Sequence, residues 1–320
     1  EQYPPDAQKG LRQFSLAEVA YYLGVTQSTI KKLHLEGKGP DPETSSSGRR
    51  SYSAEQMLEL RAYLDKHGRP GKRRYVPHRR EGEELHVVSV VNFKGGSGKT
   101  TTAAHLAQHL ALKGHRVLAI DLDPQASLTA LHGIQPELDN VPSLYETLRY
   151  DDQRKPIIEV IRPTNFPNLD IVPASLELQE YEYDTPVALT SSDPHEGRLF
   201  FTRISKALDE VDDRYDVVVI DCPPQLGYLT LTALTASSSV IVTARVIIIV
   251  RRRLEQLAPA TQQALLAARA GATPVLRIQH RDAGGEVVGQ CREIGMPRRA
   301  QLAELVRPGA HRVRPLDPAR

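Results

Sequence analysis

Val-Val-Asn-Phe-Lys-Gly-Gly-Ser-Gly-Lys-Thr-Thr-Thr, residues 90–102, is the stretch that decides the fold of this chain. It follows the apolar run Leu85–Val91 and precedes a helix-forming run, Ala103–Leu112. A strand, a glycine-rich turn and a helix, in that order, are the context of a phosphate-binding loop. The loop departs from the pattern G-x-x-x-x-G-K-[ST] in two ways, because Phe93 stands at the first glycine and a second lysine, Lys94, precedes the glycines.

The residue types in this loop suit a bound polyphosphate. The three glycines within residues 95–98 allow successive backbone N–H groups to point inward, and the helix that follows adds its free N–H groups. We expect Lys99 to reach the β- and γ-phosphates, the Thr100 hydroxyl to ligate Mg²⁺, and Thr101 to lie near the α-phosphate. A glycine-rich turn with two exposed lysines is the alternative. The residues predicted to hold ATP are Lys94, Gly95, Gly96, Ser97, Gly98, Lys99, Thr100 and Thr101.

Acidic residues end two further apolar runs. The run 116–125 ends with Asp121 and Asp123 in Asp-Leu-Asp-Pro-Gln, and the run 215–224 ends with Asp221 in Asp-Cys-Pro-Pro. Continuous apolar runs are typical of parallel strands that are buried on both faces. Ligands of open α/β sheets bind beyond the carboxyl ends of such strands. We therefore expect the three acids to meet a Mg²⁺-nucleotide at one sheet edge, although a lone Asp after a strand is commonly a turn or cap residue.

The predicted fold class is α/β: a P-loop NTPase with a mostly parallel sheet, preceded by a small helical winged helix-turn-helix domain. Between the motifs, the sequence predicts helices over residues 143–148, 177–183, 198–211 and 228–236, and strands over residues 168–173 and 239–243. The predicted division of the chain is a DNA-binding domain at 1–68, a charged linker at 69–84, a nucleotide-binding domain at 85–243 and an atypical tail at 244–320.

Three motifs resemble those of the ParA-type partition ATPases, a deviant Walker A group that also holds MinD-like and nitrogenase-iron-protein-like ATPases. They are Lys-Gly-Gly-Ser-Gly-Lys-Thr-Thr from Lys94, Asp-Leu-Asp-Pro-Gln from Asp121 and Val-Ile-Asp-Cys-Pro-Pro from Val219. The resemblance implies that Lys94 reaches across a dimer to the nucleotide of the other subunit, and that Asp123 positions or activates the attacking water. It also implies that Asp221 holds Mg²⁺ through water and that Asp121 supports the metal site. The predicted catalytic residues are therefore Asp123, Lys94 and Lys99, and the predicted metal site is Thr100, Asp121 and Asp221.

Residues 14–35 have the pattern of a helix-turn-helix. Ser15 is a predicted N-cap with Glu18 three residues later, which makes a capping box. We expect Gly24 to end the first helix and Thr26 to cap the second. The second helix then offers polar side chains to the major groove of DNA. The predicted DNA contacts are Gln27, Ser28, Lys31 and Lys32 on this helix, with Arg49 and Arg50 on the segment that follows it.

A short basic wing, Gly48-Arg-Arg-Ser-Tyr52, and a helix over 53–66 are predicted next. This order resembles the MerR-like winged-helix module, and a small helical cap or dimerisation domain is the alternative. The linker at 69–84 is charged, and its basic half is expected either to touch nucleic acid or to be solvated. A DNA module ahead of a ParA-type ATPase resembles the RepA partition proteins of repABC-type plasmids, over roughly residues 14–243.

Composition sets bounds on partners and compartment. The chain has 320 residues and a formal net charge of +2, so attraction to DNA must come from local basic patches. The two cysteines predict no disulfide framework and suit a reducing cytoplasm. They are Cys222 and Cys291, and because Cys222 lies inside the third nucleotide motif, we expect no iron-sulfur cluster between subunits. The apolar run at 245–250 is too short to span a bilayer, and we predict no membrane partner.

The tail, residues 244–320, differs from the rest of the chain because it has no lysine and no aromatic residue and is rich in arginine and alanine. Residues 254–270 are compatible with an alanine-rich helix, and the remainder has no clear period. The tail is either a divergent basic extension that binds DNA or, as the abrupt change of composition favours, a gene end translated in a shifted reading frame.

The first functional hypothesis is an ATP-dependent DNA-segregation protein that forms a homodimer on binding ATP and Mg²⁺. It would bind operator and non-specific DNA, repress its own operon, hydrolyse ATP when stimulated by a ParB- or RepB-like centromere-binding protein, and work in the bacterial cytoplasm at the nucleoid or plasmid. The second hypothesis is a DNA-binding repressor whose ATPase half is inert. A MinD-like membrane ATPase is the third.

Overall fold

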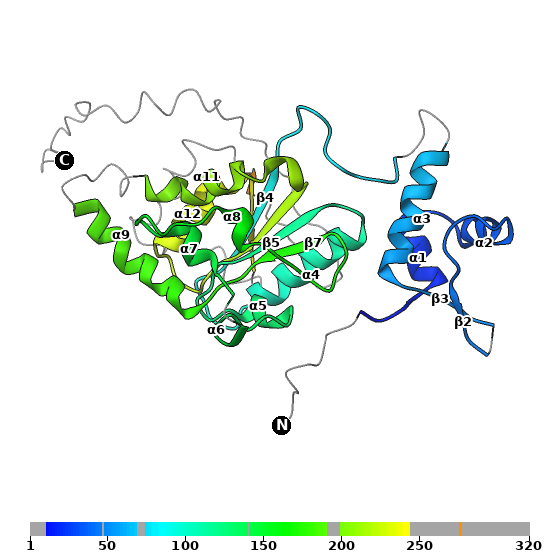
Figure 1. Cartoon of the computed structure of the whole chain (residues 1–320), viewed down its shortest axis with the longest axis horizontal. Coiled ribbons are helices and arrows are strands. Elements are labelled where there is room, and N and C mark those ends of the chain that lie inside the picture. The colour runs from blue at the N-terminus through cyan, green and yellow to red at the C-terminus, as the bar shows by residue number, and fades with distance from the viewer. Residues whose placement is uncertain are drawn as a thin grey trace, which may run out of the picture.

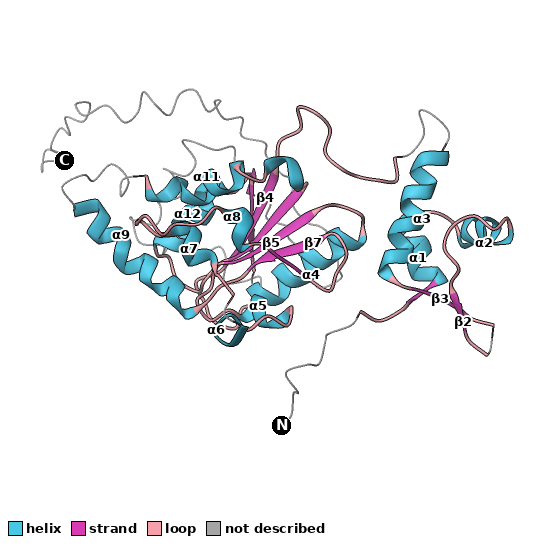
Figure 2. Cartoon of the chain, in the orientation of Figure 1, coloured by secondary structure: helices cyan, strands magenta, loops and turns pink. Residues whose placement is uncertain are grey.

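The computed structural model describes residues 11–46, 48–68, 74–139, 141–190, 199–243 and 275–276. Figure 1 shows two folded parts joined by the linker, and Figure 2 shows that a sheet occupies the centre of the larger part. Most of the tail lies outside the described residues, as does the helix predicted over 254–270.

The N-terminal part is a winged helix-turn-helix. Its elements are β1 (Phe14–Ser15), α1 (Leu16–Leu23), α2 (Gln27–Leu35), β2 (Glu43–Thr44), β3 (Arg50–Tyr52) and α3 (Ala54–His67). The strands form an antiparallel sheet in the order β1-β3-β2, and the β2–β3 hairpin is the predicted wing. The Ser15 capping box, the left-handed Gly24 and the Thr26 cap are all confirmed.

The larger part is built on a seven-stranded sheet in the order β10-β9-β4-β8-β5-β7-β6, in which only β6 runs antiparallel to its neighbour. This confirms the mostly parallel α/β class. The strands are β4 (His86–Val91), β5 (Val117–Asp121), β6 (Arg162–Pro163), β7 (Leu169–Val172), β8 (Val217–Asp221), β9 (Ser239–Val242) and β10 (Val275–Leu276). Strand β10 comes from the tail and pairs with β9.

Helices cover both faces of this sheet (Figure 1). They are α4 (Lys99–Leu112), α5 (Ser127–Leu131), α6 (Pro136–Asp139), α7 (Leu144–Leu148), α8 (Ile157–Val160), α9 (Glu180–Thr190), α11 (Arg203–Asp209) and α12 (Tyr228–Ala236), with short 3₁₀ turns η1 (Leu176–Gln179), η2 (Phe200–Thr202) and η3 (Asp212–Arg214). Alternate residues of the central strands face opposite cores. In β8, Val218 and Ile220 pack in one core and Val217 and Val219 in the other.

Two helix predictions need correction in their bounds. The helix predicted over 177–183 is the 3₁₀ turn η1 followed by α9, which continues to Thr190. The helix predicted over 198–211 is the 3₁₀ turn η2 followed by α11, which ends at Asp209. Helix ends commonly fray or tighten into a 3₁₀ turn, so sequence patterns define them only to within a few residues.

Arg61 of α3 connects the N-terminal module to the ATPase part. Its guanidinium donates to the carbonyl oxygens of Tyr22 (2.9 Å), Tyr75 (2.8 Å) and Leu112 (3.1 Å), and the residue is only 5% exposed. Leu112 is the last residue of α4 and belongs to the hydrophobic core of the winged-helix module. The two parts therefore share a buried contact at the C-terminal end of α4.

The described part of the linker, residues 74–84, is also fixed to the ATPase part. The backbone N–H of Arg79 donates to Asp216 Oδ1 at 2.8 Å, and its side chain donates to the carbonyl oxygen of Tyr215 at 2.9 Å. Asp216 is buried and also accepts the backbone N–H of Arg116 at 2.7 Å. The linker is therefore held on the larger part at Arg79, whereas residues 80–84 are exposed.

Candidate nucleotide site

The phosphate-loop candidate lies between β4 and α4, as the sequence predicts. Gly96 and Gly98 adopt left-handed conformations, with φ of +67° and +83°, which glycine tolerates better than any other residue. Gly98 is also the N-cap of α4. A Cβ atom added at Gly95, Gly96 or Gly98 would meet no protein atom within 4 Å, so this side of the loop borders open space. The geometry fits a loop whose backbone N–H groups are available to a ligand.

Two residues that the sequence analysis missed hold the loop in place. Asn92 accepts the backbone N–H of Lys94 at 2.9 Å through Oδ1, and its side-chain amide donates to the carbonyl oxygen of Thr243. The Thr243 hydroxyl donates to Ser97 Oγ at 3.1 Å. The loop is thus tied to the end of β9. The sequence signal for Asn92 is its position between the strand and the glycines, because Asn side chains commonly form hydrogen bonds with nearby backbone groups.

The predicted loop side chains differ in their surroundings. Lys99 is buried, and its positive charge acts to lower the pKa of Asp221, which places the two groups near each other. Ser97 and Thr100 are half-buried, whereas Thr101 is exposed. Lys94 is exposed as well, and so is Phe93, at the position of the missing glycine. The Lys94 side chain is therefore accessible to solvent.

Asp121 and Asp221 are neighbours at the carboxyl edge of the sheet. They end β5 and β8 and are directly paired in the register of these strands, and both are 0% exposed. Burial raises the pKa of Asp121 to about 6 and that of Asp221 to about 7. Thr100 lies close enough to oppose the rise at Asp221 but makes no hydrogen bond to either of its oxygens.

The two carboxylates differ in their hydrogen bonds. Both oxygens of Asp221 are buried without a hydrogen-bond partner. Asp121, in contrast, accepts the backbone N–H and the hydroxyl of Thr129 at Oδ2, at 2.8 and 2.7 Å, and the backbone N–H of Asp123 at Oδ1, at 3.2 Å. Buried polar atoms are rarely left unpaired, so Asp221 is the carboxylate that needs a ligand.

Mg²⁺ fits this arrangement. It takes oxygen ligands, keeps several waters, and is commonly bound by one or two carboxylates together with substrate phosphates. The orphaned oxygens of Asp221, beside the Thr100 hydroxyl and the phosphate loop, match that requirement. Among the described residues, no cluster of three or more His, Cys, Asp or Glu side chains offers a metal site made by protein alone.

Asp123 lies at the edge of the same site. It is half-buried, and its negative charge contributes to raising the pKa of both Asp121 and Asp221. Its Oδ1 accepts the backbone N–H of Gln125 at 3.1 Å, and its carbonyl oxygen accepts that of Ala126 at 2.8 Å. The structure therefore brings all three predicted acids to the sheet edge next to the phosphate loop.

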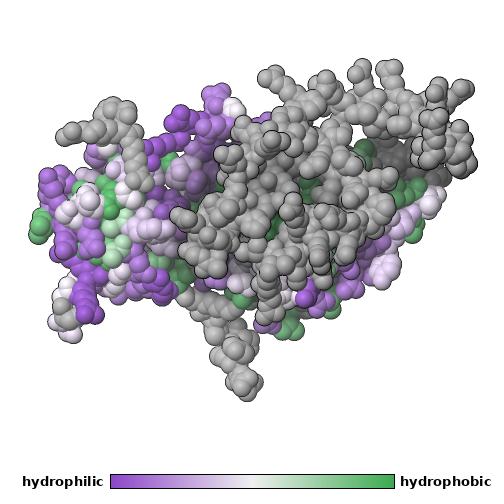
Figure 3. All heavy atoms as spheres, turned by 180° about the vertical axis from the view of Figure 1, so that it is seen from behind, coloured by the Kyte–Doolittle hydropathy of each residue, from purple (hydrophilic) through white to green (hydrophobic). Residues whose placement is uncertain are grey.

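The predicted DNA contacts lie on the N-terminal module, on a surface that is mainly hydrophilic in Figure 3. Five of the six side chains are exposed, namely Gln27, Ser28, Lys31, Lys32 and Arg49, whereas Arg50 on β3 is half-buried. The Ser28 hydroxyl bonds to Thr26 Oγ1 at 2.7 Å, and Lys32 lies 3.8 Å from Glu36. The helix α2 thus presents a polar face with two lysines.

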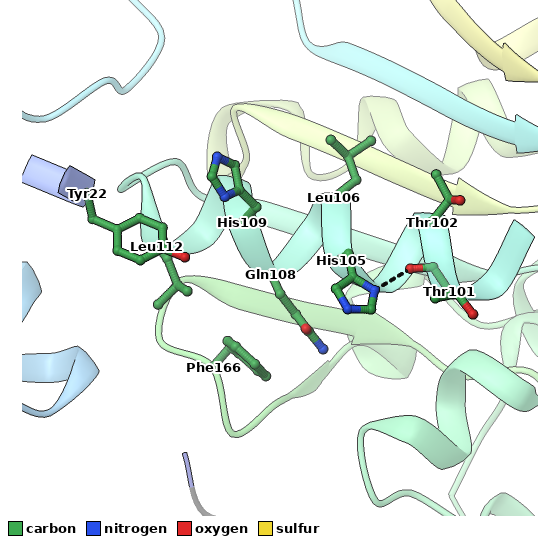
Figure 4. Close-up of a pocket in the computed structure, with 9 residues that line it drawn as sticks. All are labelled: Tyr22, Thr101, Thr102, His105, Leu106, Gln108, His109, Leu112 and Phe166. Atoms are coloured by element: carbon green, nitrogen blue, oxygen red, sulfur yellow. Dashed lines mark hydrogen bonds between the residues drawn. The ribbon is translucent and has the colours of Figure 1, made fainter. Parts of the chain in front are cut away.

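A second cavity, of about 640 Å³, opens where the module meets the outer face of α4 (Figure 4). Tyr22 of α1 faces Leu112 and Phe166 across it, and His105 Nδ1 donates a hydrogen bond to the Thr101 carbonyl oxygen at 2.7 Å. The lining includes none of the loop glycines or acids. Thr101, which is predicted to lie near the α-phosphate, is part of the lining, so the cavity borders the predicted nucleotide site along α4.

Fold and site together define a P-loop ATPase domain joined to a DNA-binding module, and two family matches agree with this class. The AAA domain family matches residues 85–267, more than half of the chain, and the MerR HTH family regulatory proteins match residues 14–64. The first match continues past Thr243, where the sequence analysis expects the resemblance to end. The chain belongs to the AAA domain family and, within it, to the ParA-type ATPases.

Named relatives are similar over most of the same region. A protein named as a replication protein A in Sinorhizobium fredii is 75% identical over 243 residues, which are 76% of this chain and 60% of that protein. One of the same name in Rhizobium rhizogenes is 54% identical over 75% of this chain and 60% of its own length. The chromosome partitioning protein ParA of Myxococcus xanthus is 41% identical over 49% of this chain and 50% of its own length. The chain therefore spans about 60% of the length of the first two relatives.

Proposed function

We propose that this chain binds Mg²⁺-ATP at residues 94–101 and hydrolyses it. The observation that carries the proposal is Asp221, whose two buried oxygens lack partners at the point where Lys99, Thr100 and the glycine loop meet. A buried carboxylate in that state is stabilised by a cation, and the neighbouring loop offers backbone N–H groups suited to phosphates. The relatives in the ParA-type family support the same choice of ligand.

In this proposal each loop residue has a separate task. Lys99 and the backbone N–H groups of residues 95–98 hold the phosphates, and Thr100 with Asp221 holds Mg²⁺, which supplies positive charge to the phosphate oxygens. Asp123 positions or activates the attacking water from the half-exposed edge of the site. Asp121 supports the metal site through its position beside Asp221. The exposed Lys94 is free to reach the nucleotide of a second subunit.

The proposed biological role is DNA segregation. The homology to partition ATPases and the winged-helix module support a protein that dimerises on ATP, binds operator and non-specific DNA, and represses its own operon. A ParB- or RepB-like centromere-binding protein is the proposed partner that stimulates hydrolysis. The proposed location is the bacterial cytoplasm, at the nucleoid or the plasmid. No helix within the described residues is long and apolar enough to cross a membrane.

ATP turnover with and without DNA tests the proposal. We expect turnover in the natural chain and its loss in Lys99→Ala, with the circular dichroism spectrum of the variant unchanged. Equal turnover in the two folded proteins would refute the assignment of the loop. Lys94→Ala separates the dimer from nucleotide binding: it should still bind a fluorescent ATP analogue but sediment as a monomer with ATP. A dimer of Lys94→Ala would contradict a role across the interface.

The second candidate is a repressor whose ATPase half is inert. It is favoured by the exposed polar face of α2 and by the wing, which are built without any contribution from the phosphate loop. Gel shift of the full chain against the DNA upstream of its gene distinguishes the two. Sequence-specific binding by both the natural chain and Lys99→Ala, without turnover in either, would leave repression as the activity. Binding to liposomes would instead favour a MinD-like ATPase.

A further inference from the structure

The loop that carries Asp123 is closed by one buried carboxylate. Asp121 ends β5, and its Oδ1 accepts the backbone N–H of Asp123 at 3.2 Å. Its Oδ2 accepts both the backbone N–H and the hydroxyl of Thr129, at 2.8 and 2.7 Å. The two ends of the segment 123–129 are therefore fastened to the same side chain. Thr129 stands in α5 and is not among the residues that the motifs predict.

Thr129 also connects this loop to a third part of the sheet. Its hydroxyl donates to Asp121 and accepts the backbone N–H of Ala174 at 3.0 Å, just beyond β7. The threonine is 0% exposed, so these bonds form away from water. Hydrogen bonds to a charged group are stronger than neutral ones, and a buried group that loses its partner carries the full cost of desolvation. The hydroxyl thus fixes α5 relative to both β5 and β7.

Between these fixed ends the loop has a constrained backbone. Ala126 has a φ of +51°, a left-handed conformation that is uncommon for a residue with a side chain. Its N–H donates to the carbonyl oxygen of Asp123 at 2.8 Å, and Gln125 donates to the Asp123 carboxylate at 3.1 Å. Such a conformation persists only where the surroundings define it. The hydrogen bonds from Thr129 to Asp121 hold the C-terminal end of this loop in place.

We propose that Thr129 is a positioning residue for ATP hydrolysis: by holding Asp121, it closes the segment 123–129 and sets the place of Asp123. The inference rests on the proposed function and assigns Asp121 a structural task, while Asp221 faces the metal. Thr129 acts through Asp123 and touches no ligand itself. A residue of this kind affects the transition state more than substrate binding, because the phosphate loop on α4 is left intact.

The test separates kcat from KM in three variants. Thr129→Val keeps the shape of the side chain and removes the hydroxyl, and a misplacement of about 1 Å costs on the order of 100-fold in rate. We expect kcat of Thr129→Val to fall by roughly 10- to 100-fold, with the KM for ATP and the affinity for a fluorescent ATP analogue within about twofold of the natural values. Thr129→Ser, which keeps the hydroxyl, should restore most of kcat.

Thr185→Val is the matched control. Thr185 is also 0% exposed, and its hydroxyl donates to the Tyr181 carbonyl oxygen at 2.7 Å within α9, away from the acids. It should lose a similar amount of thermal stability without the loss of kcat.

The outcomes distinguish the inference from the function on which it rests. No turnover in the natural chain refutes the proposed function. Turnover in the natural chain with an unchanged kcat in Thr129→Val, or a kcat equally low in Thr185→Val, overturns the role of Thr129. If Thr129→Val does not fold, Thr129→Ser decides alone: a folded serine variant with kcat reduced as far as 10-fold contradicts a role for the hydroxyl.

Discussion

Replacement of Arg61 by methionine should loosen the winged-helix module from the ATPase part. Arg61 donates to three carbonyl oxygens, those of Tyr22, Tyr75 and Leu112, and only the last of these belongs to the ATPase domain proper. A hydrogen bond from a charged donor contributes about 1.5–3 kcal/mol, and water that reaches part-buried carbonyls recovers some of the loss. Only the bond to Leu112 is lost when the two parts separate, so we expect about 2 kcal/mol, which is roughly a 30-fold shift toward the undocked arrangement.

Limited proteolysis of the linker, residues 69–84, measures this shift. When docking is fast, the cleavage rate follows the population of the open form, so cleavage of Arg61→Met should be roughly 30 times faster. Gly114→Ala is an independent way to disturb the contact, because a Cβ atom there would lie 2.5 Å from Arg61 Cδ and the glycine has a φ of +96°. Gly114→Ala should therefore also accelerate cleavage of the linker.

Arg203→Met serves as the control for the loss of a buried arginine. Arg203 is 7% exposed and donates to the carbonyl oxygens of Leu148 and Arg149, all within the ATPase part. It should lower the melting temperature without favouring cleavage in the linker. Unchanged cleavage in a folded Arg61→Met, or equal acceleration in Arg203→Met, would refute the idea that Arg61 holds the two parts together.

Three further predictions concern charge and capping. Asp221 has a raised pKa of about 7, so without Mg²⁺ the melting temperature should fall as pH rises from about 4 to 7. Asp221→Asn should reduce this fall to the part that Asp121, with a pKa of about 6, contributes, and added Mg²⁺ should counteract the fall only in the natural chain. Glu18, held by Arg12 and the Ser15 N–H, has a pKa lowered to about 2, so the melting temperature of Glu18→Gln should lie below that of the natural chain above pH 5 and approach it toward pH 2. Glu182→Gln weakens the cap of α12, where the carboxylate accepts two backbone N–H groups at 2.8 and 2.9 Å, and calorimetry should show a loss of about 1 kcal/mol.

The sequence predicts the central strands and the place of the acids well because both follow from local patterns. The runs that end at Val91, Asp121 and Asp221 consist mainly of apolar residues, as is typical of parallel strands buried on both faces, and each lies within a residue or two of β4, β5 and β8. The Ser15 and Ser53 capping boxes are likewise local, and both are present. In each case the deciding contacts span only a few residues.

Contacts between distant residues are what the sequence leaves open. Arg61 looks like an ordinary charged residue of an amphipathic helix, yet it bonds to a carbonyl 51 positions away. Arg79 lies in a charged stretch, basic first and then acidic, and it bonds to Asp216, 137 positions away. Neither partner can be assigned until the helices and strands are placed in space.

The motifs place Asp121 and Asp221 at the same sheet edge but do not distinguish their hydrogen bonds. Both end buried strands, both stand 0% exposed at the same sheet edge, and the register pairs them directly. The two carboxylates differ in their hydrogen bonds. The chain after β5 turns back within eight residues, so that the backbone N–H and the hydroxyl of Thr129 both donate to Asp121, whereas neither oxygen of Asp221 has a hydrogen-bond partner. The negative charge of Asp121 contributes to the raised pKa of Asp221, whose oxygens have no hydrogen-bond donor, so we expect the proposed divalent cation to bind at Asp221 rather than to be shared by both acids.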